Sequence, residues 1–192
     1  MNILFQKFAA THQKKKIVKG HLGNWCAMPL EHNEKRLEII NLCWIPSSSS
    51  TGECCSCTQH VIVDKKVKTI AEHRKETLQG IKNYARRNED ITDVVIAGDY
   101  NLDVRDNAMR KFYADIGAID VHTKINNIEM NQMDKTSKLG LKPIDSFAAS
   151  AGILDYVEGS MTFDFNKIFE TDHRGYLVDV GLDEYFELEF SG

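Results

Sequence analysis

The sequence contains no long apolar run. None of its windows approaches the roughly 18 apolar residues that a membrane-spanning helix needs, so we expect no membrane partner. The first ten residues are too short, and too polar at Gln6 and Lys7, to form a secretory signal peptide. We therefore expect an intracellular protein, and the sequence does not distinguish nucleus from cytoplasm.

The chain also lacks a strong net charge. Its 192 residues carry a formal charge of −4, with 42% hydrophobic and 27% charged positions. This composition is typical of a globular domain that buries one sizeable core. Contact with nucleic acid would need a local basic patch, although short basic runs are commonly only solvated surface. The candidate patches are Lys14, Lys15, Lys16 and Lys19, and then Arg86 and Arg87.

Disulfides are not expected either. Five cysteines, an odd number without a secretory signal, indicate reduced thiols. Cys54, Cys55 and Cys57 with His60 resemble a soft-metal ligand set, but they lie in a small, polar, loop-like segment. Two adjacent cysteines make poor tetrahedral geometry without a second pair, so we do not favour structural zinc, and the role of this cluster stays open.

Strand-like and helix-like patterns alternate along the rest of the chain. Because the helices fall between strands, the order favours a mixed α/β layered domain. The first two strands are joined by a polar turn at His32 to Lys35, which predicts a hairpin, and residues 126–142 form a polar loop. The predicted strands cover 20–28, 37–45, 94–97, 118–121, 143–149, 156–163 and 175–180, and the predicted helices cover 70–87 and 108–116.

The most informative segment is the apolar strand 94–97, which ends in Gly98, Asp99, Tyr100 and Asn101. Because side chains alternate along a strand, we expect Asp99 and Asn101 to share one side and Tyr100 to point to the other. A carboxylate can accept a proton from water or bind a hard cation, and an amide can donate to a phosphate oxygen. The alternative is an ordinary Asp/Asn turn after a strand.

Two further segments carry acidic and imidazole groups. Asp172 and His173 stand at a charged turn before an apolar strand. An imidazole titrates near neutral pH and a nearby carboxylate favours its charged form, so the pair could act as an acid/base unit or be plain surface. Asp145 stands in an apolar strand, where an unpaired carboxylate is costly. His173 would satisfy it, as would a local lysine or exposure at a sheet edge.

In this order, the three segments resemble the endonuclease/exonuclease/phosphatase superfamily, which includes the DNase I-like nucleases. The family's Gly-Asp-x-Asn, Ile-Asp and Ser-Asp-His motifs are matched by Gly98, Asp99 and Asn101, by Ile144 and Asp145, and by Thr171, Asp172 and His173. The sequence around Asp145 and Asp172 is most similar to the endonuclease domains of non-LTR retroelements (retrotransposons), where such domains precede a reverse transcriptase.

The resemblance implies a DNase I-like layered α/β sandwich, with two mixed β-sheets flanked by helices but lacking the N-terminal strands. We expect a poorly ordered N-terminal leader at 1–19, a partial catalytic domain at 20–182 and a C-terminal tail at 183–192. Family members carry a Gln-Glu motif, with a metal-binding Glu, before the first strands seen here. Residues 1–19 contain no such motif, and Glu31 and Glu34 lie at a predicted turn, so neither takes its role.

The resemblance also implies roles for individual residues. Asp99 would orient or deprotonate the attacking water and, with Asp172, bind Mg²⁺, for which Mn²⁺ could substitute. Asn101 would hold the scissile phosphate, His173 would stabilise its charge, and Asp145 would orient His173.

A Tyr-Arg pair contacts phosphate in the abasic-site endonucleases of the family, and its nearest match is His73-Arg74, with His in place of Tyr. We therefore expect His73, Arg74 and Asn101 to contact phosphate or nucleic acid.

Three functions are compatible with this resemblance. We favour a metal-dependent hydrolase that cleaves phosphodiesters in DNA as an endonuclease, with DNA as its partner and a reverse transcriptase in a longer parent polypeptide. The first alternative is a remnant that is inactive without the N-terminal Glu and binds nucleic acid or protein. The second is a phosphatase of phosphorylated lipids or inositols.

Overall fold

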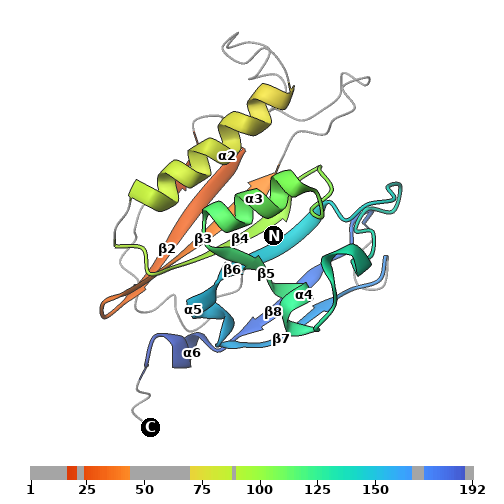
Figure 1. Ribbon diagram of the computed structural model, residues 1–192. Helices are drawn as coiled ribbons and strands as arrows, with labels where there is room; N and C mark the ends of the chain where they lie inside the picture. Colours follow the sequence, from red (N-terminus) through yellow and green to blue (C-terminus); the bar gives the residue numbers. More distant parts are fainter. Residues whose placement is uncertain (1–16, 21–23, 44–69, 88–89, 166–170, 189–192) are drawn as a thin grey trace.

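The structure is a computed structural model that describes residues 17–20, 24–43, 70–87, 90–165 and 171–188 (Figure 1). The cysteine cluster at 54–57, His60 and the lysines at 14–16 lie outside these residues. Arg87 belongs to a described helix, but its side chain is outside the description.

A six-stranded sheet forms the centre of the fold, in the order β1-β2-β3-β4-β6-β5. Neighbouring strands are antiparallel except for β3 and β4, which are parallel. The strands are β1 Val18–Lys19, β2 Trp25–His32, β3 Lys35–Cys43, β4 Asp93–Asp99, β5 Ala118–Asp120 and β6 Asp145–Ser150.

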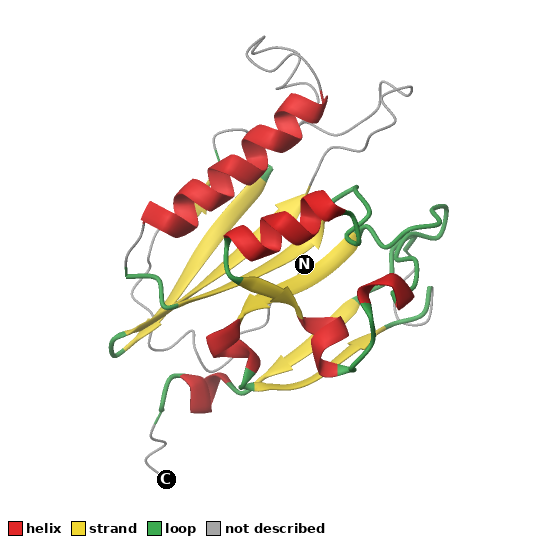
Figure 2. Ribbon diagram, viewed as in Figure 1, coloured by secondary structure: helices red, strands yellow, loops and turns green. Residues whose placement is uncertain are grey.

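A second sheet consists of the antiparallel pair β7 Val157–Thr162 and β8 Tyr176–Val180. Two longer helices, α2 Ile70–Arg87 and α3 Asn107–Asp115, lie along one face of the six-stranded sheet (Figure 2). The short elements are α4 Val121–Ile125, the 3-10 turn η2 Met130–Gln132, α5 Ala151–Leu154 and α6 Leu182–Tyr185. This arrangement confirms the predicted α/β layers of two sheets flanked by helices.

Apolar side chains on both faces of the central strands form two core clusters. On β4, Ile96 packs with the helices α2 and α3, whereas Val95 belongs to the cluster that includes α5, α6 and the partly buried side of β8. A strand that is covered on both faces reads as a continuous apolar run, which is the pattern of residues 94–97. Asp99, two residues after this run, is the last residue of β4 and lies at the rim of the sheet.

Gly98 allows β4 to pass close to β3 just before this rim. Its φ is +151°, and a Cβ at this position would lie 1.8 Å from the carbonyl oxygen of Leu42. Only glycine fits so near a backbone oxygen. The close packing of β4 against β3 thus requires glycine at position 98, whether or not the site is catalytic.

The predicted hairpin of β2 and β3 forms, with Asn33 in the left-handed region at φ 53°. The structure also contains elements that the sequence did not predict. β1, inside the region expected to be a poorly ordered leader, pairs with β2. The region expected to be a tail supplies α6, and its Tyr185 and Phe186 are 2% and 1% exposed.

The stretch 118–121, predicted as extended, stops one residue early because Asp120 caps α4 by accepting a hydrogen bond from the Thr123 backbone N–H at 2.8 Å.

Within the part of the chain that is described, no helix has the length and apolar character needed to cross a membrane.

Candidate metal and phosphoester site

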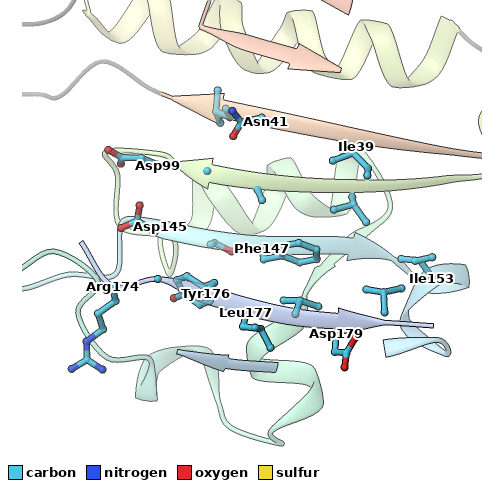
Figure 3. A pocket seen from close by; sticks show the side chains of 18 of the residues that line it. Ile39, Asn41, Asp99, Asp145, Phe147, Ile153, Arg174, Tyr176, Leu177 and Asp179 are labelled. Carbon is cyan, nitrogen blue, oxygen red and sulfur yellow. The ribbon is translucent and has the colours of Figure 1, made fainter. Parts of the chain in front are cut away.

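Side chains from three distant segments meet at one rim of the six-stranded sheet. Asp99 ends β4, Asp145 begins β6, and the two residues are paired directly across the antiparallel ladder. Because the two strands run in opposite directions, both carboxylates lie at the same edge of the sheet, as Figure 3 shows. His173 precedes β8, and one ligand atom from each of the three residues lies within 4.8 Å of the others. Two carboxylates and an imidazole at this spacing could hold a metal ion.

Asp145 and His173 form a hydrogen-bonded pair. The distance between His173 Nδ1 and Asp145 Oδ2 is 2.9 Å. Because an ionised carboxylate only accepts hydrogen bonds, Nδ1 carries the proton and donates it. The contact fixes the ring and leaves Nε2 as its second functional atom. The sequence had left the partner of Asp145 open among histidine, lysine and solvent, and the structure brings His173 to it.

Burial and mutual charge shift the pKa values of this group. Burial, followed by the negative charge of Asp145, raises the pKa of Asp99 to about 6. Burial also raises the pKa of Asp145, although its hydrogen bonds oppose the rise. Burial alone would lower the pKa of His173, but the hydrogen bond to Asp145 and the charges of Asp145, Asp99 and Asp172 raise it overall. The rim therefore combines an imidazole whose charged form is favoured with a carboxyl whose pKa is about 6.

Asn101 faces Asp99 through a tight turn. The Asn101 backbone N–H donates to Asp99 Oδ1 at 2.8 Å, and its side-chain Nδ2 donates to Asp99 Oδ2 at 2.8 Å. Tyr100 between them is fully buried, with its ring edge-on to Tyr113. The two residues share a side as expected, but for a different reason. The strand ends at Asp99, and Asn101 adopts a left-handed φ of 46° instead of continuing the alternation.

The other expected site residues lie in different surroundings. Asp172 is exposed and lies outside the three-residue group, although its charge acts on both His173 and Asp145. Arg74 is half-buried, and its Nη2 donates to the Asn101 carbonyl oxygen at 2.9 Å. His73 is 0% exposed on the inner side of α2, so in this conformation its ring offers no surface to a nucleic acid.

A groove of about 830 Å³ runs from this rim between the inner face of the six-stranded sheet and β8 (Figure 3). It is lined near the rim by Asn41, Cys43 and Arg174, which the sequence reasoning did not select. The signal that could have found the first two is the parallel pairing of β3 with β4, because the carboxyl ends of parallel strands meet. Cys43 is the direct partner of Asp99 in this pairing.

No protein-family model and no curated protein matches the sequence. Solved structures do match. The endonuclease domain of TRAS1, a telomere-specific non-LTR retrotransposon, superposes with a TM-score of 0.56 at 13% identity, over 86% of this chain and 66% of that domain. A 3′ phosphatase, NExo from Neisseria bound to a product DNA hairpin, gives 0.54 at 10% identity, over 82% and 65%. An AP endonuclease from Archaeoglobus fulgidus gives 0.53 at 14% identity, over 87% and 71%.

These similarities establish that the chain has the DNase I-like endonuclease/exonuclease/phosphatase fold, as the sequence motifs predicted. The fold is that of hydrolytic nucleases and phosphatases. The chain spans 65% of NExo, 53% of an AP endonuclease from Leishmania major and 66% of the TRAS1 domain. At such low identity the similarity shows the fold alone, because one fold can carry several different activities.

Proposed function

We propose that this chain is a divalent-metal-dependent phosphodiesterase that cleaves DNA as an endonuclease. The observation that carries the proposal is the meeting of Asp99, Asp145 and His173 at one rim of the sheet, with Asn101 hydrogen-bonded to Asp99. DNA as the substrate is supported by the neighbours, one bound to a DNA hairpin and another from a retrotransposon. The place of the chain in a longer polypeptide with a reverse transcriptase is part of this proposal.

In the proposed reaction, water displaces the ester oxygen at phosphorus in a single step, and each side chain has a separate role. Asp99, with a pKa of about 6, is mostly ionised at neutral pH and takes a proton from the attacking water. The P–O bond to water forms as the ester P–O bond breaks, and the leaving oxygen takes a proton from solvent. No covalent enzyme intermediate is needed.

Asn101 and His173 act on the phosphoryl oxygens. The Asn101 amide donates to Asp99 Oδ2 and lies beside the proposed reacting centre, where an amide N–H can donate to a phosphate oxygen of the substrate. His173, held at Nδ1 by Asp145, presents a charged N–H at Nε2 to the negative charge that builds during the reaction. Arg74 supports this side by fixing the Asn101 carbonyl.

The residues at the rim fit a divalent ion. Carboxylate oxygens are the ligands that Mg²⁺ prefers, and Mn²⁺ accepts them as well. His173, protonated on both ring nitrogens in its proposed role, would act on the phosphate and not as a ligand. Asp99 belongs both to the sequence-based pair with Asp172 and to the three-residue group in the structure, so we propose it as the shared ligand. A bound ion would neutralise charge on the phosphoryl oxygens.

Nicking of supercoiled plasmid tests the proposal. The purified chain should nick plasmid with Mg²⁺ and stop when EDTA is added, and His173→Ala should reduce nicking by at least about 100-fold. His32→Ala is the matched control, because His32 ends β2 at the opposite end of the sheet from Asp99. Absence of nicking at high protein concentration, or full activity in His173→Ala, would remove the activity claim and leave the fold intact.

A non-catalytic role in binding nucleic acid or protein is the second candidate. Tight DNA binding that weakens steeply with salt and is unchanged in Asp99→Ala would support this role. Failure to bind DNA at any salt concentration would count against it.

A phosphatase acting on phosphorylated lipids or inositols is the third candidate. NExo is described as a 3′ phosphatase, so phosphomonoester chemistry occurs on this fold. A panel that compares plasmid, 3′-phosphorylated DNA and inositol phosphates separates this candidate from the first. Turnover of inositol phosphates alone would favour it.

A further inference from the structure

Thr136 is a buried residue of the polar loop that precedes β6, with 1% of its surface exposed. Its Oγ1 accepts hydrogen bonds from the backbone N–H groups of Ile144 and Asp145 at 2.8 and 3.0 Å. The same side chain opposes the rise in the pKa of Asp145 that burial causes. The hydroxyl therefore accepts from the backbone of Asp145 and favours the ionised form of its carboxylate.

The two backbone contacts use both acceptor sites of the hydroxyl. A threonine hydroxyl has one donor and two acceptor sites. The N–H groups of Ile144 and Asp145 occupy the acceptor sites, which leaves the O–H as a donor beside Asp145. The first residue of β6 is therefore held at its backbone by a buried side chain.

The backbone of the same residue reaches the other half of the pair. The Thr136 carbonyl oxygen accepts from the Arg174 N–H at 2.7 Å, and Ser137 forms an antiparallel bridge with His173. The Lys138 N–H donates to the Asp172 carbonyl oxygen at 2.6 Å. Residues 136–138 thus form a short ladder beside residues 172–174.

We propose that Thr136 is a positioning residue, which joins Asp145 to the segment that carries His173 and so sets the Asp145–His173 hydrogen bond. This inference rests on the proposed phosphodiesterase function, because a fixed His173 matters only where its ring acts on substrate. Thr136 itself does not touch the substrate. Groups that act on a transition state must be held within about 0.5 Å of their working geometry. A residue hydrogen-bonded to Asp145 and to Arg174, the neighbour of His173, can achieve this.

The test compares three variants in the plasmid assay. Thr136→Val keeps the shape but removes the hydroxyl, leaving two buried N–H groups without their acceptor. We expect kcat to fall by about 10- to 100-fold with KM nearly unchanged, as is typical when a residue that supports an active group is removed. Thr136→Ser keeps the hydroxyl and should restore most of kcat.

Ser150→Ala is the matched control, because it removes a comparable hydroxyl from the opposite end of β6. Ser150 Oγ accepts from the Val94 N–H at 3.0 Å and donates to the Asp93 carboxylate. This variant should lose stability in urea unfolding, as Thr136→Val does, while keeping its kcat per folded molecule. Full kcat in Thr136→Val, or a Thr136→Ser variant as slow as Thr136→Val, would overturn the proposal.

A second measurement does not depend on activity. The Nδ1 proton of His173 should give a low-field signal in proton NMR, assigned by its loss in His173→Ala. We expect this signal in the wild type and in Thr136→Ser, and its loss or broadening in folded Thr136→Val. An unchanged signal in Thr136→Val would overturn the positioning role. Plasmid that stays intact while the signal follows this pattern would instead count against the phosphodiesterase function alone.

Discussion

Asp99→Asn should stabilise the metal-free protein at neutral pH while it removes hydrolysis. Asp99 is half-buried, and burial with the nearby charge of Asp145 raises its pKa from 3.8 to about 6. An amide carries no charge to bury. Its oxygen can still accept the Asn101 backbone N–H now found at 2.8 Å, and the Asn101 side chain can rotate to offer its own oxygen to the new NH₂ group.

The magnitude follows from the pKa. A rise from 3.8 to about 6 corresponds to about 3 kcal/mol of lost stability once the carboxyl is ionised. Because solvent screens a half-buried group, we expect about 1 to 2 kcal/mol. The folded protein binds the proton of the Asp99 carboxyl more tightly than the unfolded chain does. The stability that this proton binding contributes is therefore fully present below the unfolded pKa of 3.8 and is lost as the pH rises through about 6.

Urea unfolding in EDTA, followed by tryptophan fluorescence, measures this effect. The advantage of Asp99→Asn over the wild type should be near zero at about pH 4 and reach its full value at about pH 7.5. Asp155→Asn removes an exposed carboxyl outside the site and should change stability by less than about 0.5 kcal/mol. An advantage that does not change with pH, or a less stable variant at about pH 7.5, would refute the reasoning.

Three further outcomes follow from the fold and the site. Gly98→Ala should destabilise by more than about 3 kcal/mol or prevent folding, because its Cβ would lie 1.8 Å from the Leu42 carbonyl oxygen; near-wild-type urea unfolding would contradict this close approach. Ile96→Ala, at a position 0% exposed, should cost about 2 to 5 kcal/mol, whereas Leu139→Ala, at 90% exposure, should stay within about 0.5 kcal/mol of the wild type in the same assay. Added Mg²⁺ should raise the Tm of the wild type more than that of Asp99→Asn, and equal increases would contradict an ion at Asp99.

The elements that the sequence predicted are those whose pattern is local. A buried central strand appears as a continuous apolar run, so residues 94–97 predicted β4, whose last residue is Asp99. The amphipathic period likewise identified α2 over the bounds that it has, Ile70–Arg87. The two short segments around Asp145 and His173 could be found, but their contact could not be derived from the residues alone. The contact depends on the pairing of residues 136–138 with residues 172–174, two segments that lie far apart in the sequence.

The features that escaped prediction depend on tertiary contacts. Thr136 was one polar residue in a polar loop, and nothing local marks it as buried. The contact of Arg74 with a carbonyl oxygen requires α2 to lie over the turn at Asn101. α6 has four residues, too few for a periodic pattern, so Tyr185 and Phe186 read as part of a tail although both are buried.

Titration of the metal-free protein with Mn²⁺, with free Mn²⁺ measured by EPR, tests most directly whether Asp99, Asp145 and His173 form a metal-dependent centre. Wild type and Asp155→Asn should each show a saturable site that Mg²⁺ displaces, and Asp99→Asn should lose it. Equal Mn²⁺ binding by wild type and Asp99→Asn, or no saturable binding by the wild type, would contradict the account.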